Sequence, residues 1–336
     1  MYYRTYSDKF NDLGVPVNTV GAVQSNRFAI MYYKLKNPKD WTKLDRAKKK
    51  ICKAFNGSEY LGEMKNGAEF ALMFPLPAEF WTFYKYENYG GNFEKTAKAG
   101  DFQLGVTLDG KELKANIYNT RSILIAGSSG GGKSSLMNCI IDSITRSSDN
   151  IIIDCIDLKR VELGFYNYFK NTQHYVATTK REAADLLRSV KNEIDNRYQT
   201  MSEKKILKAN PEDFPPYIIF IDEFAALDAP AGSTIHSLVS YITAVGRACG
   251  VFMVIATQHP KNSVIDNTIR ANCSTKILLA CSNAAQSTTI CGSKIGIELL
   301  GKGDAFLFLD GELHPIRFQA PLYDEETRNK LYYIKK

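Results

Sequence analysis

The chain has 336 residues, of which 44% are hydrophobic and 24% are charged, and its formal net charge is +7. This composition excludes a chain that is disordered throughout, and the length allows more than one folded unit. No run approaches eighteen apolar residues and the polar start does not resemble a signal peptide, so no insertion into a membrane is expected. The seven cysteines form no CxxC pair and the four histidines lack metal-ligand spacing, which indicates reduced thiols in a cytoplasmic protein.

The first hundred residues predict a small α+β unit. Strand-like stretches at 25–35 and 68–74 flank a helix at 41–55, where apolar residues recur near the 3.6-residue helical period. Between Lys34 and Lys53 stand nine basic residues and two acidic ones. A run of this kind is typical of a solvated helix face, but it also suits a surface for a phosphate backbone, and both interpretations stay open.

Beyond residues 100–120 the pattern changes to apolar, β-branched runs that alternate with long helical segments. The predicted strands are 122–126, 151–155, 217–221, 251–256, 276–281 and 305–309, and the predicted helices are 133–146, 180–202 and 233–249. Such alternation is typical of a mainly parallel sheet covered by helices on both faces. We therefore predict an α/β fold with two domains, a small α+β subdomain at 1–115 and a larger domain at 116–336 with a mainly parallel central sheet flanked by helices.

The clearest motif follows the strand at 122–126. Residues 127–134 read Gly-Ser-Ser-Gly-Gly-Gly-Lys-Ser, the G-x-x-x-x-G-K-[ST] pattern, between a predicted strand and a predicted helix. Glycines let backbone N–H groups surround a phosphate, and the helix N-terminus adds partial positive charge. Lys133 is expected to meet the β- and γ-phosphates of ATP, and the Ser134 hydroxyl to bind Mg²⁺. The predicted nucleotide-binding residues are Gly127, Ser128, Ser129, Gly130, Gly131, Gly132, Lys133, Ser134 and Ser135.

A second motif ends the strand at 217–221, where an apolar run leads into Asp222 and Glu223. Ligands of open α/β sheets bind at the carboxyl ends of the strands, so both carboxylates are expected beside the phosphate loop. Asp222 is predicted to hold Mg²⁺ and Glu223 to orient and deprotonate the attacking water. The strand at 251–256 ends in Thr257 and Gln258, and the Gln258 amide is a candidate sensor of the γ-phosphate.

Together these segments resemble the FtsK/SpoIIIE family of DNA-translocating motors, whose ATPase domain is RecA-like. The matching stretches occur in the family's order, at 122–135, 156–163, 192–198, 220–227, 246–250, 256–260, 269–276 and 301–304. More faintly, the segment from about 11 to 120 resembles the family's smaller motor subdomain. The resemblance implies a homo-oligomeric, usually hexameric ring that uses ATP to pull double-stranded DNA through its channel.

In such a ring a neighbouring subunit's arginine can complete each active site. The resemblance makes Arg197 and Arg247 the candidates, with Arg270 a third. DNA is expected to contact lysines and arginines of channel loops, mainly through phosphates. The candidate DNA contacts are Lys204, Lys205, Lys208, Lys261 and Arg270, each of which could instead be a solvated surface residue.

The sequence departs from the chromosome-segregating members of this family. It shows neither membrane helices ahead of the motor nor a winged-helix domain after it, and His259 stands where many members have arginine. A motor of this kind resembles the proteins that serve transfer, replication or mobilisation of mobile elements. The alternatives are a helicase-like motor on single strands, an ATP-gated adaptor that recruits a relaxase or replication initiator, and a protein-secretion ATPase.

Overall fold

The chain folds into two compact units. The computed structural model describes residues 9–24, 27–54, 59–63, 69–76, 78–86, 97–260 and 264–335. One unit comprises Met1–Phe83 with Leu108–Gly110, and the other comprises Tyr84–Thr107 with Lys111–Lys336. The structure thus divides the chain earlier than the predicted boundary at 115, because strands β5 (Asp101–Thr107) and β6 (Glu112–Asn116) pair within the larger sheet. Among the described residues no helix is long and apolar enough to cross a membrane.

The first unit is an antiparallel sheet packed against one long helix. Its strands are β1 (Val17–Gln24), β2 (Phe28–Leu35), β3 (Glu59–Glu63) and β4 (Glu69–Pro75), in the order β1-β2-β4-β3. Helix α2 (Trp41–Ala54) buries Leu44 and Ile51 against the sheet residues Tyr33 and Phe70. The predicted helix and both predicted strands are confirmed, and β1 and β3 are additions.

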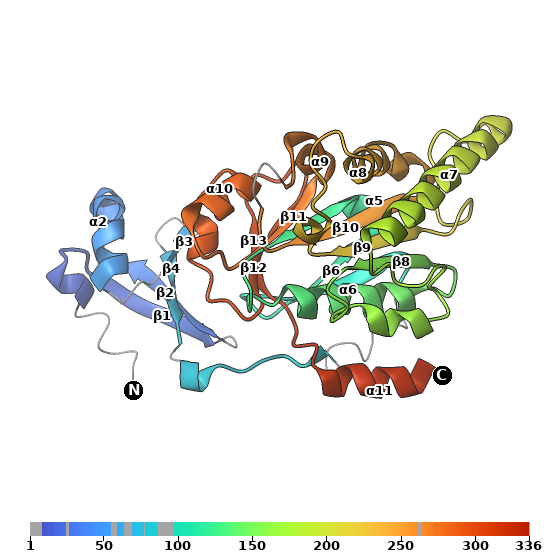
Figure 1. The fold of residues 1–336 in the computed structure, drawn as a ribbon. Helices are drawn as coiled ribbons and strands as arrows, with labels where there is room; N and C mark the ends of the chain where they lie inside the picture. Colours follow the sequence, from blue (N-terminus) through green and yellow to red (C-terminus); the bar gives the residue numbers. More distant parts are fainter. Residues whose placement is uncertain are drawn as a thin grey trace. The chain divides into compact units, whose positions relative to one another are not determined.

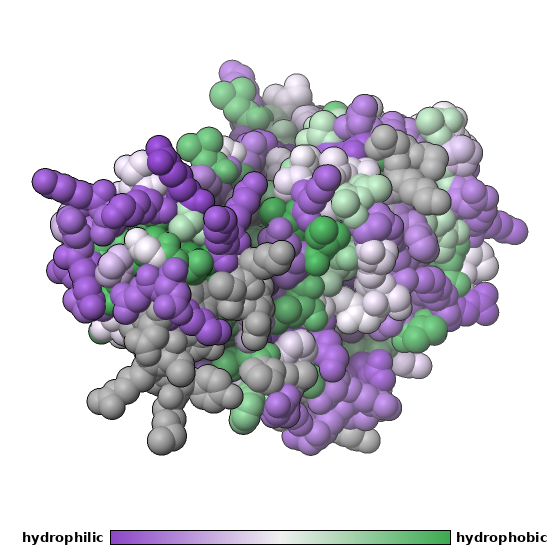
Figure 2. Space-filling view, turned by 90° about the vertical axis from the view of Figure 1, so that its left-hand side faces the viewer, coloured by the Kyte–Doolittle hydropathy of each residue, from purple (hydrophilic) through white to green (hydrophobic). Residues whose placement is uncertain are grey.

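The opposite side of α2 carries part of the basic run. Lys43, Arg46, Lys49 and Lys50 are exposed, and Lys43 Nζ lies 2.8 Å from Asp40 Oδ1. Hydrophilic side chains cover much of the face shown in Figure 2. The described basic residues of α2 are thus solvated, and contact of the run with a phosphate backbone stays a prediction.

The second unit is built on a nine-stranded sheet in the order β6-β5-β13-β12-β11-β7-β10-β9-β8 (Figure 1). Strands β8 (Ile152–Asp157), β9 (Tyr217–Asp222), β10 (Val251–Thr257), β7 (Ile123–Ala126) and β11 (Thr275–Leu279) run parallel. From β11 onward, β12 (Asp304–Phe308), β13 (Ile316–Gln319), β5 and β6 pair antiparallel. The sheet is therefore mixed, with a parallel half and an antiparallel half, where a mainly parallel sheet was predicted.

Helices cover both faces of this sheet, as the apolar strands predict. Along β7, Ile123 and Ile125 pack in the core under α6 (Lys133–Ser147), whereas Leu124 and Ala126 pack in the core under α7 (Lys180–Lys204) and α8 (Thr234–Val245). Thr179 starts α7 with a capping box, in which its hydroxyl accepts from the Glu182 N–H. All six strands and three helices predicted for this unit are confirmed to within a few residues.

Short elements complete the chain. They are η1 (Pro38–Asp40), η2 (Ala78–Phe80), α5 (Ile117–Thr120), η3 (Gly164–Tyr168), η4 (Phe224–Leu227), η5 (Gly246–Cys249), α9 (Asn267–Asn272), α10 (Ala284–Cys291), η6 (Ile295–Ile297) and α11 (Glu325–Lys335). Because β7, β10 and β9 are adjacent and run parallel, their carboxyl ends meet at one edge of the sheet.

Candidate nucleotide-binding and hydrolysis site

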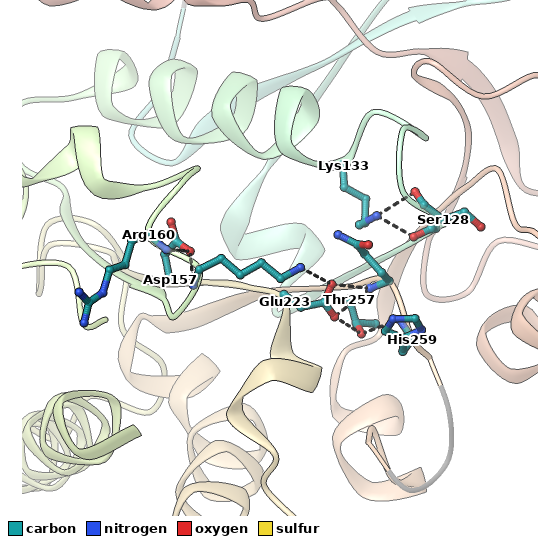
Figure 3. Close-up of polar contacts among 10 residues, drawn as sticks. Ser128, Lys133, Asp157, Arg160, Glu223, Thr257 and His259 are labelled. Atoms are coloured by element: carbon teal, nitrogen blue, oxygen red, sulfur yellow. Dashed lines mark hydrogen bonds and ion pairs between the residues drawn. The ribbon is translucent and has the colours of Figure 1, made fainter. Parts of the chain in front are cut away.

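The phosphate loop joins β7 to α6 and encloses the Lys133 side chain. Lys133 Nζ donates to the carbonyl oxygens of Gly127 at 2.7 Å and Ser128 at 3.0 Å (Figure 3). Burial lowers the pKa of Lys133 to about 8, although Glu223 and Asp222 act to raise it. The loop therefore holds a buried cation within reach of two carboxylates, at the N-terminus of a fifteen-residue helix.

Glycines set the shape of this loop from both sides. Gly132 has φ +105°, and a Cβ there would come within 2.6 Å of the Gly303 nitrogen. The Gly303 N–H donates to the Gly131 carbonyl at 2.7 Å. Asp304 next to it accepts from Arg317 at 2.8 and 3.1 Å and from the Leu300 N–H at 2.8 Å. The segment 301–304 thus backs the phosphate loop, which gives its Gly-x-Gly-Asp pattern a physical reason.

Asp222 ends β9 at the same edge of the sheet, separated from β7 by β10. Its side chain is buried, and its pKa is raised to about 6, first by burial and then by Asp157, Glu162 and Glu223. A carboxylate in this setting is stabilised by a cation. The residues present therefore fit the predicted Mg²⁺, with oxygen ligands from Asp222 and from Ser134, which lies half-buried in the first turn of α6.

Glu223 follows in a backbone conformation that non-glycine residues seldom adopt, with φ +53° and ψ +71°. Its carboxylate is 4% exposed and reaches the end of β10. Oε1 accepts from the Thr257 hydroxyl and the Gln258 N–H, both at 3.1 Å, and Oε2 lies 3.2 Å from the same N–H. The strand between β7 and β9 therefore fixes the predicted base, through Thr257 and the backbone of Gln258. The role predicted for the Gln258 amide stays a prediction.

The loop after β8 adds a cation that the sequence did not single out. Lys159 Nζ lies 3.4 Å from Glu223 Oε2. Within the described residues no cluster of histidine, cysteine and acidic side chains suits a metal held by protein ligands alone.

The side chains of Ser128 and Ser135 contact other parts of the chain rather than the interior of the loop. The Ser135 hydroxyl donates to the Pro321 carbonyl at 2.9 Å and accepts from the Tyr323 N–H at 2.7 Å. Ser128 Oγ lies 3.4 Å from Gln286 Oε1, and its N–H donates to the Ala280 carbonyl at 2.8 Å. We therefore assign the Ser135 hydroxyl to holding the segment before α11 rather than to phosphate contact.

Arg197 and Arg247, the first two of the three arginines predicted to act on a neighbour, differ in their surroundings. Arg197 is 2% exposed, and its guanidinium donates to Glu193 at 2.7 Å and to the Cys249 carbonyl at 3.0 Å. Bound in this way, Arg197 holds α7 to the start of β10 and does not point out of its own chain. We therefore correct its assignment to a packing role.

Arg247 is partly exposed in η5, and its pKa is lowered by burial and by Arg121. Arg121 Nη1 pairs with Asp310 Oδ2 at 2.9 Å. Because Arg121 precedes β7 and Arg247 precedes β10, this cluster lies at the sheet edge opposite the phosphate loop. Of the two predicted arginines, Arg247 is the one available to another chain.

The residues predicted to contact DNA also differ in how exposed they are. Lys204, Lys205 and Lys208 are exposed at the end of α7, whose C-cap Lys205 has φ +58°. Arg270 is partly buried and donates to Asn267 at 2.8 Å and to the Thr289 carbonyl, so its guanidinium is bound within the chain. Lys261 lies outside the described residues.

The fold and the site together define a P-loop ATPase domain. A lysine in a glycine-rich loop at a helix N-terminus interacts electrostatically with an acidic pair at the end of a buried strand of the same sheet.

Comparisons with known proteins show which P-loop ATPases this chain is similar to. Residues 89–213 match the sequence model of the FtsK/SpoIIIE family. The chain is 31% identical over 258 residues to the DNA translocase FtsK of Lactococcus lactis, covering 71% of this chain and 34% of that protein. It spans about a third of the length of the curated relatives it matches.

Solved structures agree with the fold. The pCW3 conjugation coupling protein TcpA, in its monomer form with ATPγS, aligns over 98% of both chains with a TM-score of 0.68 and 18% identity. EssC (ATPases 2 and 3) from Geobacillus thermodenitrificans aligns over 71% of this chain and 49% of that one, with a TM-score of 0.62 and 18% identity. At 18% identity these structures show a shared fold. The match of residues 89–213 to the family model and the 31% identity to a DNA translocase FtsK confirm the resemblance to the FtsK/SpoIIIE family.

Proposed function

We propose that the chain is an ATP-driven motor that translocates double-stranded DNA as a hexameric ring. The observation that carries the ATPase part is the meeting of Lys133 with the buried pair Asp222 and Glu223 at one edge of the sheet. The DNA part is supported by the family match and by the names of the relatives.

The residues divide the chemistry between them. Lys133 and the N–H groups at the start of α6 bind the β- and γ-phosphates, and Ser134 with Asp222 binds Mg²⁺. A bound Mg²⁺ neutralises phosphate charge and polarises the phosphoryl group. Glu223 orients the attacking water and accepts its proton, because its carboxylate is held by Thr257 and Gln258 at the end of β10.

A neighbouring chain is proposed to complete each site with Arg247. Arg247 lies at the amino ends of the parallel strands, opposite the phosphate loop. This position favours the role, since a ring joins two different surfaces of neighbouring subunits. Mixing Arg247→Ala with Glu223→Gln chains tests the proposal. Mixed assemblies should regain part of the ATP turnover that each variant lacks, and a mixture with no regained turnover contradicts a role in trans.

DNA is proposed to contact Lys204, Lys205 and Lys208, whose exposed ammonium groups bind phosphates in a salt-dependent way. We further propose that the motor serves transfer, replication or mobilisation of a mobile genetic element, together with a relaxase or replication initiator. The coverage of TcpA, a conjugation coupling protein, over 98% of both chains supports this setting.

The deciding experiment compares ATP hydrolysis with no DNA, with single strands and with duplex DNA. Duplex DNA should raise turnover many-fold, and Lys133→Ala should abolish it. Stimulation by single strands alone would favour a helicase-like motor. Stimulation only by a protein partner would contradict a motor acting on DNA.

A further inference from the structure

Lys159 is held in place by the loop that carries it. The loop leaves β8 at Asp157, whose buried carboxylate accepts four backbone N–H groups, those of Lys159 and Arg160 at 3.0 Å, Glu162 at 2.9 Å and Leu163 at 3.0 Å. A fully buried carboxylate that accepts this many hydrogen bonds fixes the backbone around it. The position from which the Lys159 side chain starts is therefore set by the fold.

From this position the Lys159 ammonium enters the nucleotide site. It lies 3.4 Å from Glu223 Oε2, and its charge acts to lower the pKa of both Lys133 and Asp222. The next residue, Arg160, has φ +59° and directs its guanidinium away from Glu223 (Figure 3). Two neighbouring cations of one loop thus have different surroundings, and only Lys159 contacts the predicted base.

The contact matters because of what else Glu223 binds. An ionised carboxylate offers about four lone-pair positions. Three donors make four contacts with them: the Thr257 hydroxyl at 3.1 Å, the Gln258 N–H shared between both oxygens at 3.1 and 3.2 Å, and Lys159 at 3.4 Å. To orient a water and take its proton, Glu223 must release one of these partners. Lys159 is the longest contact, and its side chain is 45% exposed, so it is the partner most easily released.

We propose that Lys159 is a positioning residue that restrains Glu223, and that moving its ammonium away from Oε2 frees that oxygen for the attacking water. This inference rests on the proposed function, because it assigns a restraint to the same hydrolysis site. It explains why a cation that binds no other described acceptor reaches into the site from a loop anchored so firmly by Asp157.

The test replaces Lys159 by methionine, which keeps the length of the side chain and removes its charge. A half-exposed ion pair is worth up to about 1 kcal/mol, so DNA-free kcat should rise about two- to fivefold in Lys159→Met, a larger change than in KM or in the affinity for ATPγS. Lys159→Arg should stay near the wild-type kcat because it preserves the pair. Arg160→Met is the matched control and should change neither constant.

A second measurement does not depend on hydrolysis. Lys159→Met should lower the melting temperature of the wild type by about 1–2 °C and should have no effect in a Glu223→Gln background, because the paired charge is already gone. A kcat that is unchanged or reduced in Lys159→Met, or equal temperature shifts in both backgrounds, would overturn the restraint. A wild type that hydrolyses no ATP contradicts the proposed function instead, and the melting cycle still decides the Lys159–Glu223 contact.

Discussion

The parallel and antiparallel halves of the large sheet do different work. The parallel half carries Lys133, Asp222 and Glu223 at the carboxyl ends of its strands. The antiparallel half brings no such group to the site, but β12 begins beside the phosphate loop, where Gly303 donates to Gly131. The difference indicates that one half carries the residues proposed for the chemistry and the other holds the phosphate loop in shape.

The largest expected effect is on ATP turnover, from a change at Glu223 in the parallel half of the sheet. Glu223→Gln keeps the size of the side chain and removes the proton acceptor, so ATP turnover should fall by about 10²- to 10⁴-fold. Nucleotide affinity should change little, because no phosphate contact is predicted for Glu223. Steady-state hydrolysis and an ATPγS titration check this. Turnover within tenfold of the wild type would mean that another residue is the base, and would weaken the division of roles between the two halves of the sheet.

The next largest effect is on stability, from a change in the antiparallel half, which supports the phosphate loop. Arg317 is 8% exposed and binds Asp304, which is 1% exposed. Arg317→Met leaves that carboxylate buried without its cation, which should lower the free energy of unfolding by about 3–5 kcal/mol. Urea denaturation measures the loss, and the double variant Asp304→Asn with Arg317→Met should recover part of it. Lost turnover with unchanged stability would instead place this half in the chemistry.

A smaller effect concerns the charge of Lys133. Its pKa is lowered from the usual 10.5 to about 8 by burial, so the protonated form that binds phosphate is depleted as pH rises through 8. Binding of an anionic nucleotide stabilises the charged lysine. The dissociation constant of ATPγS should therefore be flat below pH 7 and rise up to about tenfold per unit above pH 8. Lys133→Arg, whose side chain stays charged, should remove this slope, and a slope that persists would assign it to another group.

The same division explains what the sequence could predict. Apolar runs in the sequence predicted the parallel strands, and Asp222 and Glu223 follow one of these runs directly. Strand β13 was missed because Arg317 and Gln319 interrupt its four residues, although both side chains are buried. Strand β6 was missed because Glu112 and Lys114 are exposed and its other residues are only half-buried.

Tertiary contacts account for the remaining differences at the site. Arg197 stands three residues after the buried Ile194 and four before the buried Met201, so helical spacing already places it on the buried face of α7. Its partners, the carbonyls of Cys249 and Gly250, lie more than fifty residues away and come from the fold. Lys159 reaches Glu223 across 64 residues of sequence. The pattern at 156–163 marked its loop, but only the fold brings the lysine to the carboxylate.

The smallest effect separates two neighbouring serines. The hydroxyl of Ser135 binds the Pro321 carbonyl and the Tyr323 N–H, so it belongs to the supporting contacts, whereas Ser134 is predicted to bind Mg²⁺. Ser135→Ala should lower the free energy of unfolding by about 1 kcal/mol and leave the ATPγS dissociation constant within twofold. Ser134→Ala should do the reverse, weakening Mg²⁺-dependent binding with little change in stability. If Ser135→Ala weakened binding as much as Ser134→Ala, the supporting contacts would reach the phosphates directly, and the boundary between the two halves would have to move into α6.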